Sequence, residues 1–175
     1  MAEDQSVNGT IWNKEANAIL SWFGWKAIGD IDMDVTGDDD KEYGVDTLLR
    51  IETPQSYLPL SAILEAKRYC SDSFSLASLQ GWVNRLDKKL TKLRFSEPLQ
   101  SKFPSIQECK SLNLGIIAIW FHDTNNYPQS KSKFNEALAN LKVSSKPKSS
   151  GGYNKILIID NEVICQLCSL HNAVT

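Results

Sequence analysis

The chain has few cysteines and no long apolar run, the features that mark disulfide-rich and membrane proteins. It has four cysteines in 175 residues, too few for a disulfide scaffold, which favours a reducing, cytoplasmic location. No apolar run approaches the roughly 18 residues of a membrane span, and the first residues are polar, so neither a span nor a signal peptide is expected. Hydrophobic residues at 42% and charged residues at 23% exclude a disordered tail, a collagen and a coiled coil. The sequence therefore predicts a single globular domain over residues 1–175.

Charge is nearly balanced overall but unevenly distributed along the chain. The formal net charge of −2 and the pI of about 5.7 argue against a generic basic nucleic-acid binder. Residues 30–42 nevertheless hold seven acids and one base, whereas residues 85–94 hold five bases and one acid. An acidic stretch beside a basic helix suits a site that binds metal ions and contacts a polyanion. The alternative, two solvated surfaces without a function, fits these charges equally well.

Hydrophobic periodicity predicts nine elements in a mixed α/β order. Ser75 is the predicted N-cap of a long amphipathic helix, and the final strand–helix–strand unit implies a parallel pair. Residues 144–152 are rich in Ser, Lys, Pro and Gly and predict a flexible connection. The predicted elements are a helix from Thr10 as N-cap to about Phe23, strands over 30–35, 43–52 and 58–67, a helix over 76–93, a strand over 114–121, a helix over 134–141, a strand over 155–159 and a helix over 163–170.

The second and third predicted strands bring two carboxylates together. Glu65 and Lys67 share a face of the third strand because residues two apart point the same way. If the hairpin folds about Gln55, the numbers of facing residues sum to roughly 110 or 111. Asp46 then lies opposite Leu64 or Glu65.

These residue types point to phosphodiester hydrolysis. Two carboxylates in a half-buried site repel each other, and a divalent cation removes that cost. Magnesium prefers a few carboxylate oxygens, a carbonyl such as that of Ala66, and several waters. Lys67 can orient or deprotonate an attacking water, or stabilise a phosphorane-like transition state. The alternative is a surface hairpin whose Glu65 and Lys67 are ordinary polar residues.

The motif Gly44-Val45-Asp46, eighteen residues, then Glu65-Ala66-Lys67 resembles the PD-(D/E)XK nuclease superfamily. The resemblance implies an α/β, restriction-endonuclease-like αβββαβ core with a mixed sheet flanked by helices, over about residues 10–122, with 123–175 as elaboration. It implies that Asp46, Glu65 and the Ala66 carbonyl bind Mg²⁺, with Mn²⁺ able to substitute, and that Lys67 is catalytic. It also implies two further catalytic residues on helices, for which the candidates are Glu15 and Gln80.

The resemblance further implies a DNA endonuclease in bacterial anti-phage defence or DNA processing. Because one site cuts one strand, a homodimer or a complex with a partner protein is expected. Two alternatives stay open: an inactive nuclease-fold module that docks nucleic acid or protein, and a scaffold subunit. Four basic residues align at helical spacing and are candidates for nucleic-acid binding, although a solvated helix face explains them as well. They are Arg85, Lys88, Lys89 and Lys92.

Weaker patterns favour structural roles. The acids within residues 30–34 lack the Gly and Glu of a calcium loop and fit a solvated strand face. Cys165 and Cys168, with His171 nearby, supply half of a zinc site and fit the core side of a helix. His122 fits a polar strand terminus.

Overall fold

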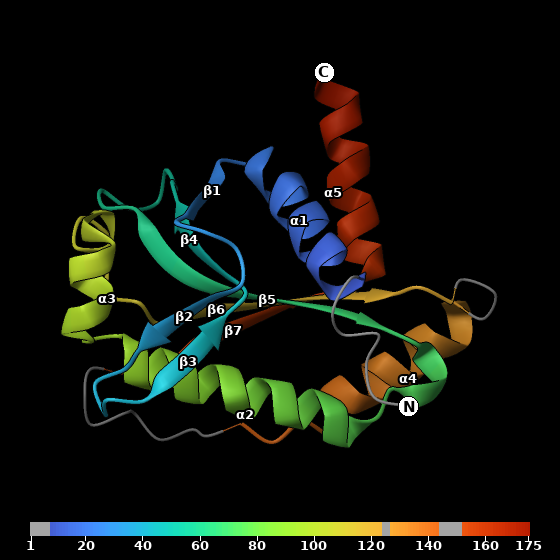
Figure 1. Ribbon diagram of the computed structural model, residues 1–175. Coiled ribbons are helices and arrows are strands. Elements are labelled where there is room, and N and C mark those ends of the chain that lie inside the picture. Colours follow the sequence, from blue (N-terminus) through green and yellow to red (C-terminus); the bar gives the residue numbers. More distant parts are fainter. Residues whose placement is uncertain (1–7, 124–126, 144–151) are drawn as a thin grey trace.

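The computed structural model in Figure 1 describes residues 8–123, 127–143 and 152–175. The helices are α1 (Asn8–Ser21), α2 (Leu76–Leu93), α3 (Glu97–Lys102), α4 (Tyr127–Ala139) and α5 (Asn161–Val174). The strands are β1 (Trp25–Ile28), β2 (Met33–Thr36), β3 (Glu42–Val45), β4 (Thr47–Ile51), β5 (Leu60–Tyr69), β6 (Leu114–Phe121) and β7 (Lys155–Ile159). Two 3₁₀ turns, η1 and η2, cover Ser71–Ser73 and Pro104–Ile106.

A five-stranded mixed sheet forms the middle layer, in the order β1-β4-β5-β6-β7. Helices α1 and α5 cover one face of this sheet, and α2 and α4 cover the other (Figure 1). β4 runs antiparallel to β1 and β5, whereas β5, β6 and β7 are mutually parallel. The predicted mixed α/β fold is therefore confirmed.

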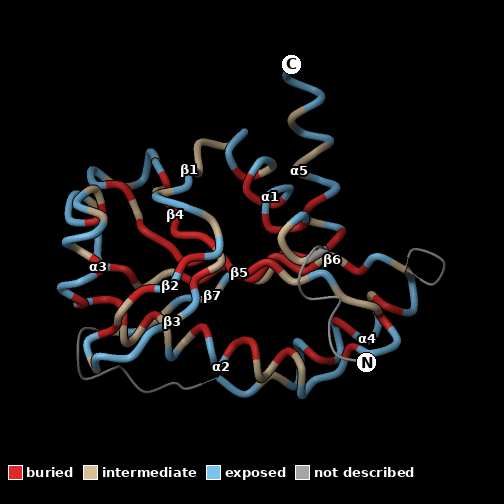
Figure 2. Tube along the Cα trace, in the orientation of Figure 1, coloured by how far each residue is buried: buried red, intermediate tan, exposed pale blue. Residues whose placement is uncertain are grey.

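Strand alternation divides the hydrophobic core into two layers. In β5, Ile63 belongs to the core under α2, whereas Ala62 and Leu64 belong to the core under α1 and α5. In the same way, Ile117 and Ile116 of β6 face opposite layers. Figure 2 shows the buried trace concentrated in the sheet and along the inner sides of the helices. A strand buried on both faces has a continuous apolar sequence, which is why β6 is found where the sequence predicts it. β7 also forms where predicted, but it lies at the edge of the sheet with Leu157 exposed, which corrects its predicted burial.

Helix α2 begins where predicted and lies close to the sheet. The Ser75 hydroxyl accepts a hydrogen bond from the Ser78 N–H at 3.2 Å and caps the helix. At Gly115 of β6, a Cβ atom would lie 2.7 Å from Cδ2 of Leu86, so glycine permits this approach. Leu86 and Leu90 of α2 therefore pack directly against β6 at Gly115.

The predicted second strand is in fact two strands with different partners. β4 pairs with β5 in the register Thr47↔Leu64, so facing numbers sum to 111, one of the two expected values. β3 leaves the sheet and pairs with β2 in a separate two-stranded ribbon. The ribbon packs Met33, Val35 and Val45 into the core under α2. This packing bends the chain at Asp46, a break that the continuous sequence alternation does not reveal.

Several other boundaries differ from the prediction. The first strand of the main sheet is β1, which the sequence did not indicate because it has four residues and lies at the edge of the sheet. The predicted strand over 30–35 corresponds to β2 of the ribbon. Helix α1 begins at Asn8 rather than after a cap at Thr10, and the short α3 was not predicted. Within the described residues, no helix is both long and apolar enough to cross a membrane. The predicted flexible connection lies outside the described residues except for Gly152.

Candidate active site

Asp46 lies at the point where the β2–β3 ribbon separates from the main sheet. Because β3 turns away there, β5 has no ladder partner from β4 beyond Leu64, and the Ala66 N–H instead donates to Asp46 Oδ2 at 2.9 Å. In a strand, the N–H and C=O of one residue point to the same side. The Ala66 carbonyl therefore faces the strand edge at which the Asp46 carboxylate lies.

Glu65 and Lys67 complete a compact charged group with Asp46. The Lys67 ammonium lies 2.9 Å from Glu65 Oε2 and 3.4 Å from Asp46 Oδ2. The Glu65 side chain is only 8% exposed, and those of Lys67 and Asp46 are 16% and 25% exposed. The structure thus brings together the three residues of the sequence motif.

Lys89 is a fourth member of this group. It extends from α2, and its ammonium forms an ion pair with Glu65 Oε1. The sequence assigns Lys89 to a nucleic-acid surface, but its side chain is only 17% exposed. Its position beside Leu86 and Leu90 of the apolar stripe was the available signal for an inward orientation.

The pKa shifts in this group follow from burial and opposite charge. Burial raises the pKa of Asp46 more strongly than Lys67 lowers it. Burial alone would also raise the pKa of Glu65, but Lys67 and Lys89 together lower it. For Lys67, burial would lower the pKa, and the carboxylates of Glu65 and Asp46 outweigh it and raise the pKa.

The raised pKa of Asp46 and the donor set fit a hard divalent cation. Because burial disfavours the ionised form of Asp46, an additional positive charge beside this carboxylate would be stabilising. Asp46 and Glu65 supply carboxylate oxygens, and Ala66 supplies a carbonyl, which are the ligand types that Mg²⁺ accepts.

A buried polar network fixes the backbone of Asp46 from the side of α1. The Asn13 amide donates to the Asp46 carbonyl at 3.0 Å and to Asp32 Oδ1 at 2.8 Å. The Asp32 N–H, in a residue with φ of 58°, also donates to the Asp46 carbonyl, at 2.9 Å. Asn17 donates to the Thr47 hydroxyl at 2.7 Å. Asparagines four residues apart on the buried side of a helix were the sequence signal for this network.

Glu15 and Gln80 are not brought into the group. Glu15 is exposed and lies two residues, or about 200° around the helix, from Asn13, which faces the site. Gln80 instead exchanges hydrogen bonds with the backbone of Lys142, donating at 2.8 Å and accepting at 2.9 Å. Its side chain therefore connects α2 to the segment after α4, and the catalytic roles assigned to both residues stay predictions.

The remaining basic residues of α2 differ in their exposure. Arg85 and Lys88 are exposed, and the Lys88 ammonium lies 6.0 Å from the centre of the Tyr43 ring. Lys92 forms an ion pair with Asp38 of the β2–β3 loop at 3.2 Å. The side chains that remain exposed for a phosphate backbone are thus fewer than predicted.

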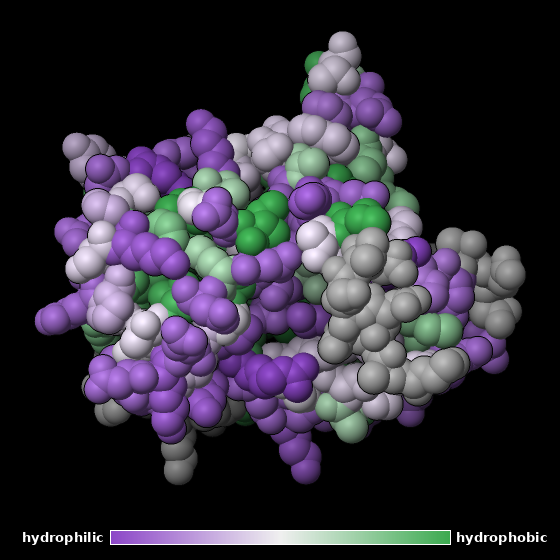
Figure 3. Space-filling view, viewed as in Figure 1, coloured by the Kyte–Doolittle hydropathy of each residue, from purple (hydrophilic) through white to green (hydrophobic). Residues whose placement is uncertain are grey.

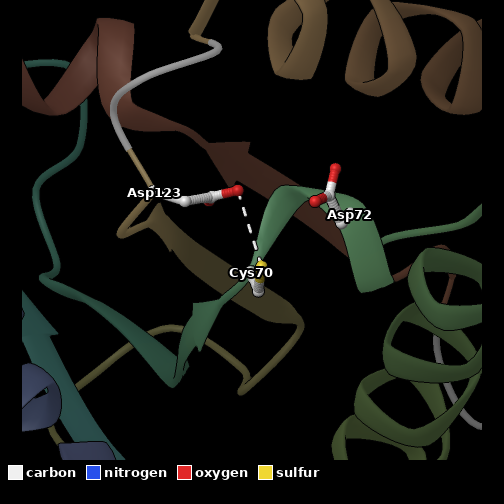
Figure 4. A group of neighbouring side chains, drawn as sticks. All are labelled: Cys70, Asp72 and Asp123. Carbon is white, nitrogen blue, oxygen red and sulfur yellow. Dashed lines mark hydrogen bonds between the residues drawn. The ribbon is translucent and has the colours of Figure 1, made fainter.

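Within the described residues, one group of three potential metal ligands lies elsewhere, at the ends of β5 and β6. It consists of Cys70, Asp72 and Asp123 (Figure 4). Asp123 Oδ1 accepts the Ser71 N–H at 2.9 Å, and its carboxylate also accepts from the Ser71 hydroxyl and, at 3.5 Å, from the Cys70 thiol. These contacts fix turn η1 and supply the Asp123 carboxylate with hydrogen-bond donors, so a structural role explains its position.

The other weak patterns also have structural explanations. Cys168 packs against the core under α5, whereas Cys165 is exposed, which corrects its predicted core position. His171 stacks on Trp22 with ring centres 4.2 Å apart. His122 follows β6, and its N–H donates to the Tyr69 carbonyl at 3.2 Å.

Two carboxylates and a lysine lie together at the point where two adjacent strands of a mixed sheet separate. This arrangement is the one expected of a PD-(D/E)XK nuclease domain. The family model for the GAPS4 protein PD-(D/E)XK nuclease domain matches residues 1–163, and the chain belongs to this family. Among solved structures, the chain is similar to the DNA modification-dependent restriction endonuclease AspBHI, with 14% identity and a TM-score of 0.39. That similarity covers 98% of this chain and 33% of the other, so this chain spans about a third of that enzyme. No curated protein matches the chain.

Proposed function

We propose that this domain is a Mg²⁺-dependent endonuclease that hydrolyses phosphodiester bonds in DNA. The observation that carries the proposal is the convergence of Asp46, Glu65 and Lys67, with the Lys67 ammonium within 3.4 Å of both carboxylates. Membership in a PD-(D/E)XK nuclease family supports the same reaction class.

Each residue of the group has a distinct proposed role. Asp46, Glu65 and the Ala66 carbonyl would hold the ion, with Mn²⁺ able to replace Mg²⁺. The ion would supply positive charge to offset the charge that develops on the phosphate in the transition state. The raised pKa of Lys67 keeps this side chain protonated, so we assign it a donor role toward the attacking water or a phosphoryl oxygen. The water oxygen would bond to phosphorus as the bond to the leaving oxygen breaks. The proton of the attacking water would pass to solvent, and the leaving oxygen would take a proton from solvent.

The proposed DNA contact lies along the exposed side of α2. Arg85 and Lys88 are exposed there, and hydrophilic side chains gather over α2 and the β2–β3 ribbon on the face seen in Figure 3. Lysine and arginine at such positions bind phosphates irrespective of sequence. Because one site cuts one strand, cleavage of both strands would need a second copy or a partner protein.

We also propose a biological setting. The GAPS4 family relation supports anti-phage defence, in which a nuclease would act on foreign DNA in the cytoplasm.

A substrate panel tests the proposal. Supercoiled plasmid, single-stranded DNA and RNA are incubated with Mg²⁺, Mn²⁺ or EDTA, using the wild type and Asp46→Asn. The matched control is Asp34→Asn, which removes an exposed acid of β2. We expect metal-dependent cleavage of DNA by the wild type and the control, and at least about a hundredfold less by Asp46→Asn. Equal cleavage by Asp46→Asn, or none by folded wild type with either metal, would contradict the proposal and favour an inactive docking module.

A further inference from the structure

Lys89 reaches the site from a different layer than the motif residues. Asp46, Glu65 and Lys67 belong to the sheet or its edge, whereas Lys89 extends from α2 and forms an ion pair with Glu65 Oε1. The neighbouring Lys88 is exposed, so the two adjacent lysines differ sharply in environment. A lysine held on a buried carboxylate is not available as a surface contact for phosphates.

Both oxygens of Glu65 are occupied by ammonium groups. Oε1 contacts Lys89, and Oε2 lies 2.9 Å from Lys67. The four charges of Asp46, Glu65, Lys67 and Lys89 sum to zero before any ion enters. The group is therefore electrostatically balanced without a metal.

A divalent ion bound to Glu65 would face the Lys89 ammonium at close range. Like charges separated by a few ångströms in a partly buried site repel strongly, because the effective dielectric constant is well below that of water. Glu65 can accept contacts from several partners at once. However, an ion and two ammonium groups on one carboxylate would repel one another, so one ammonium group is expected to move. The flexible four-carbon stem of lysine allows its ammonium to move away, whereas Glu65 is fixed in β5.

We propose that Lys89 competes with the metal ion for Glu65: it stabilises the ion-free site and releases Glu65 when the ion binds. The inference rests on the proposed function, since it requires that Glu65 be a metal ligand. Lys89 is then a positioning residue that sets the affinity for the divalent ion, rather than a DNA-binding residue.

Metal binding without DNA tests this directly. Binding of Mn²⁺ is followed by calorimetry for the wild type, Lys89→Gln, Lys89→Arg and Lys88→Gln. Lys88→Gln is the matched control, because Lys88 is the adjacent residue, is exposed and carries the same charge. Removal of the competing ammonium in Lys89→Gln should tighten Mn²⁺ binding about tenfold or more, which corresponds to about 1.4 kcal/mol or more. Lys88→Gln should change the dissociation constant by less than about twofold, because exposed charges are screened. Lys89→Arg, which keeps the charge, should not tighten binding.

A second measurement guards against a folding defect. Thermal unfolding with increasing Mn²⁺ should show a larger stabilisation of Lys89→Gln than of the wild type at the same ion concentration. Equal or weaker Mn²⁺ binding by folded Lys89→Gln would overturn the inference alone, provided that the wild type binds Mn²⁺ and Asp46→Asn does not. Absence of Mn²⁺ binding by both the wild type and Lys89→Gln would overturn the proposed function as well.

Discussion

Asn13 is expected to stabilise both the fold and the position of Asp46. It is 2% exposed and donates to Asp46 and Asp32, and its Oδ1 accepts from Asn17 at 3.0 Å and from Thr47 at 3.1 Å. The substitution Asn13→Ala removes all four contacts and leaves their partners at a buried junction between α1 and the sheet.

The expected loss of stability is large for a single polar substitution. Each lost hydrogen bond is worth a net of about 0.5–1.5 kcal/mol, and we take values near the middle of this range because the partners keep other hydrogen bonds, such as that from the Asp32 N–H to the Asp46 carbonyl. The better helix propensity of alanine returns about 0.5 kcal/mol. The free energy of unfolding should therefore fall by about 2–4 kcal/mol. For a domain of this size, that corresponds to a decrease in Tm of roughly 5–15 °C.

Urea and thermal unfolding of Asn13→Ala and Lys14→Ala measure this effect. Lys14 is the neighbouring exposed residue of α1, so its substitution controls for a general effect on the helix. Lys14→Ala should change the free energy of unfolding by less than about 0.5 kcal/mol. A loss below about 1 kcal/mol in Asn13→Ala would refute the reasoning, because it would mean that the buried network contributes little.

Three further predictions concern packing, connection and pH. Gly115→Ala should destabilise the protein by about 1–2 kcal/mol in urea unfolding, because the new Cβ would lie 2.7 Å from Leu86; unchanged stability would show that α2 moves freely. Gln80→Ala should lower stability by about 1 kcal/mol yet leave the Mn²⁺ dissociation constant unchanged, and a large change in that constant would restore Gln80 as a site residue. Burial would raise the pKa of Asp123, but hydrogen bonds from Ser71 outweigh it and hold the pKa below the usual range of an aspartate. Its stabilisation is present above the ordinary aspartate pKa and is lost as the pH falls through the lowered pKa, so Asp123→Asn should be less stable than wild type near neutral pH, with the difference shrinking in acid. A difference that persists at low pH would contradict this cause.

The sequence predicts the elements that have a simple local pattern. β6 is a continuous apolar run that is buried, β7 is a short apolar run at the sheet edge, and α2 has both a serine cap and a leucine stripe. The motif spacing and the register of β4 with β5 were sufficient to bring Asp46 near Glu65, because a hairpin register depends on local geometry.

The sequence did not predict features that depend on tertiary packing. The bend at Asp46 exists because the β2–β3 ribbon packs under α2, and no local residue pattern marks it. The sequence assigns Lys89 to the surface because the charge pattern along the helix is the same whether Glu65 lies opposite Lys89 or not. On α1, the neutral Asn13 occupies the side that faces the site, whereas Glu15, the candidate from the sequence, is exposed.

The most direct test of the central claim is cleavage of supercoiled plasmid with Mg²⁺ or EDTA by the wild type and Lys67→Ala. Lys67 contacts both proposed metal ligands, so its loss removes the ammonium group to which the proposed donor role is assigned. The account predicts nicking or linearisation by the wild type with Mg²⁺, none with EDTA, and at least about a hundredfold slower cleavage by Lys67→Ala. Cleavage by Lys67→Ala at the wild-type rate, or cleavage by the wild type that persists in EDTA, would contradict it.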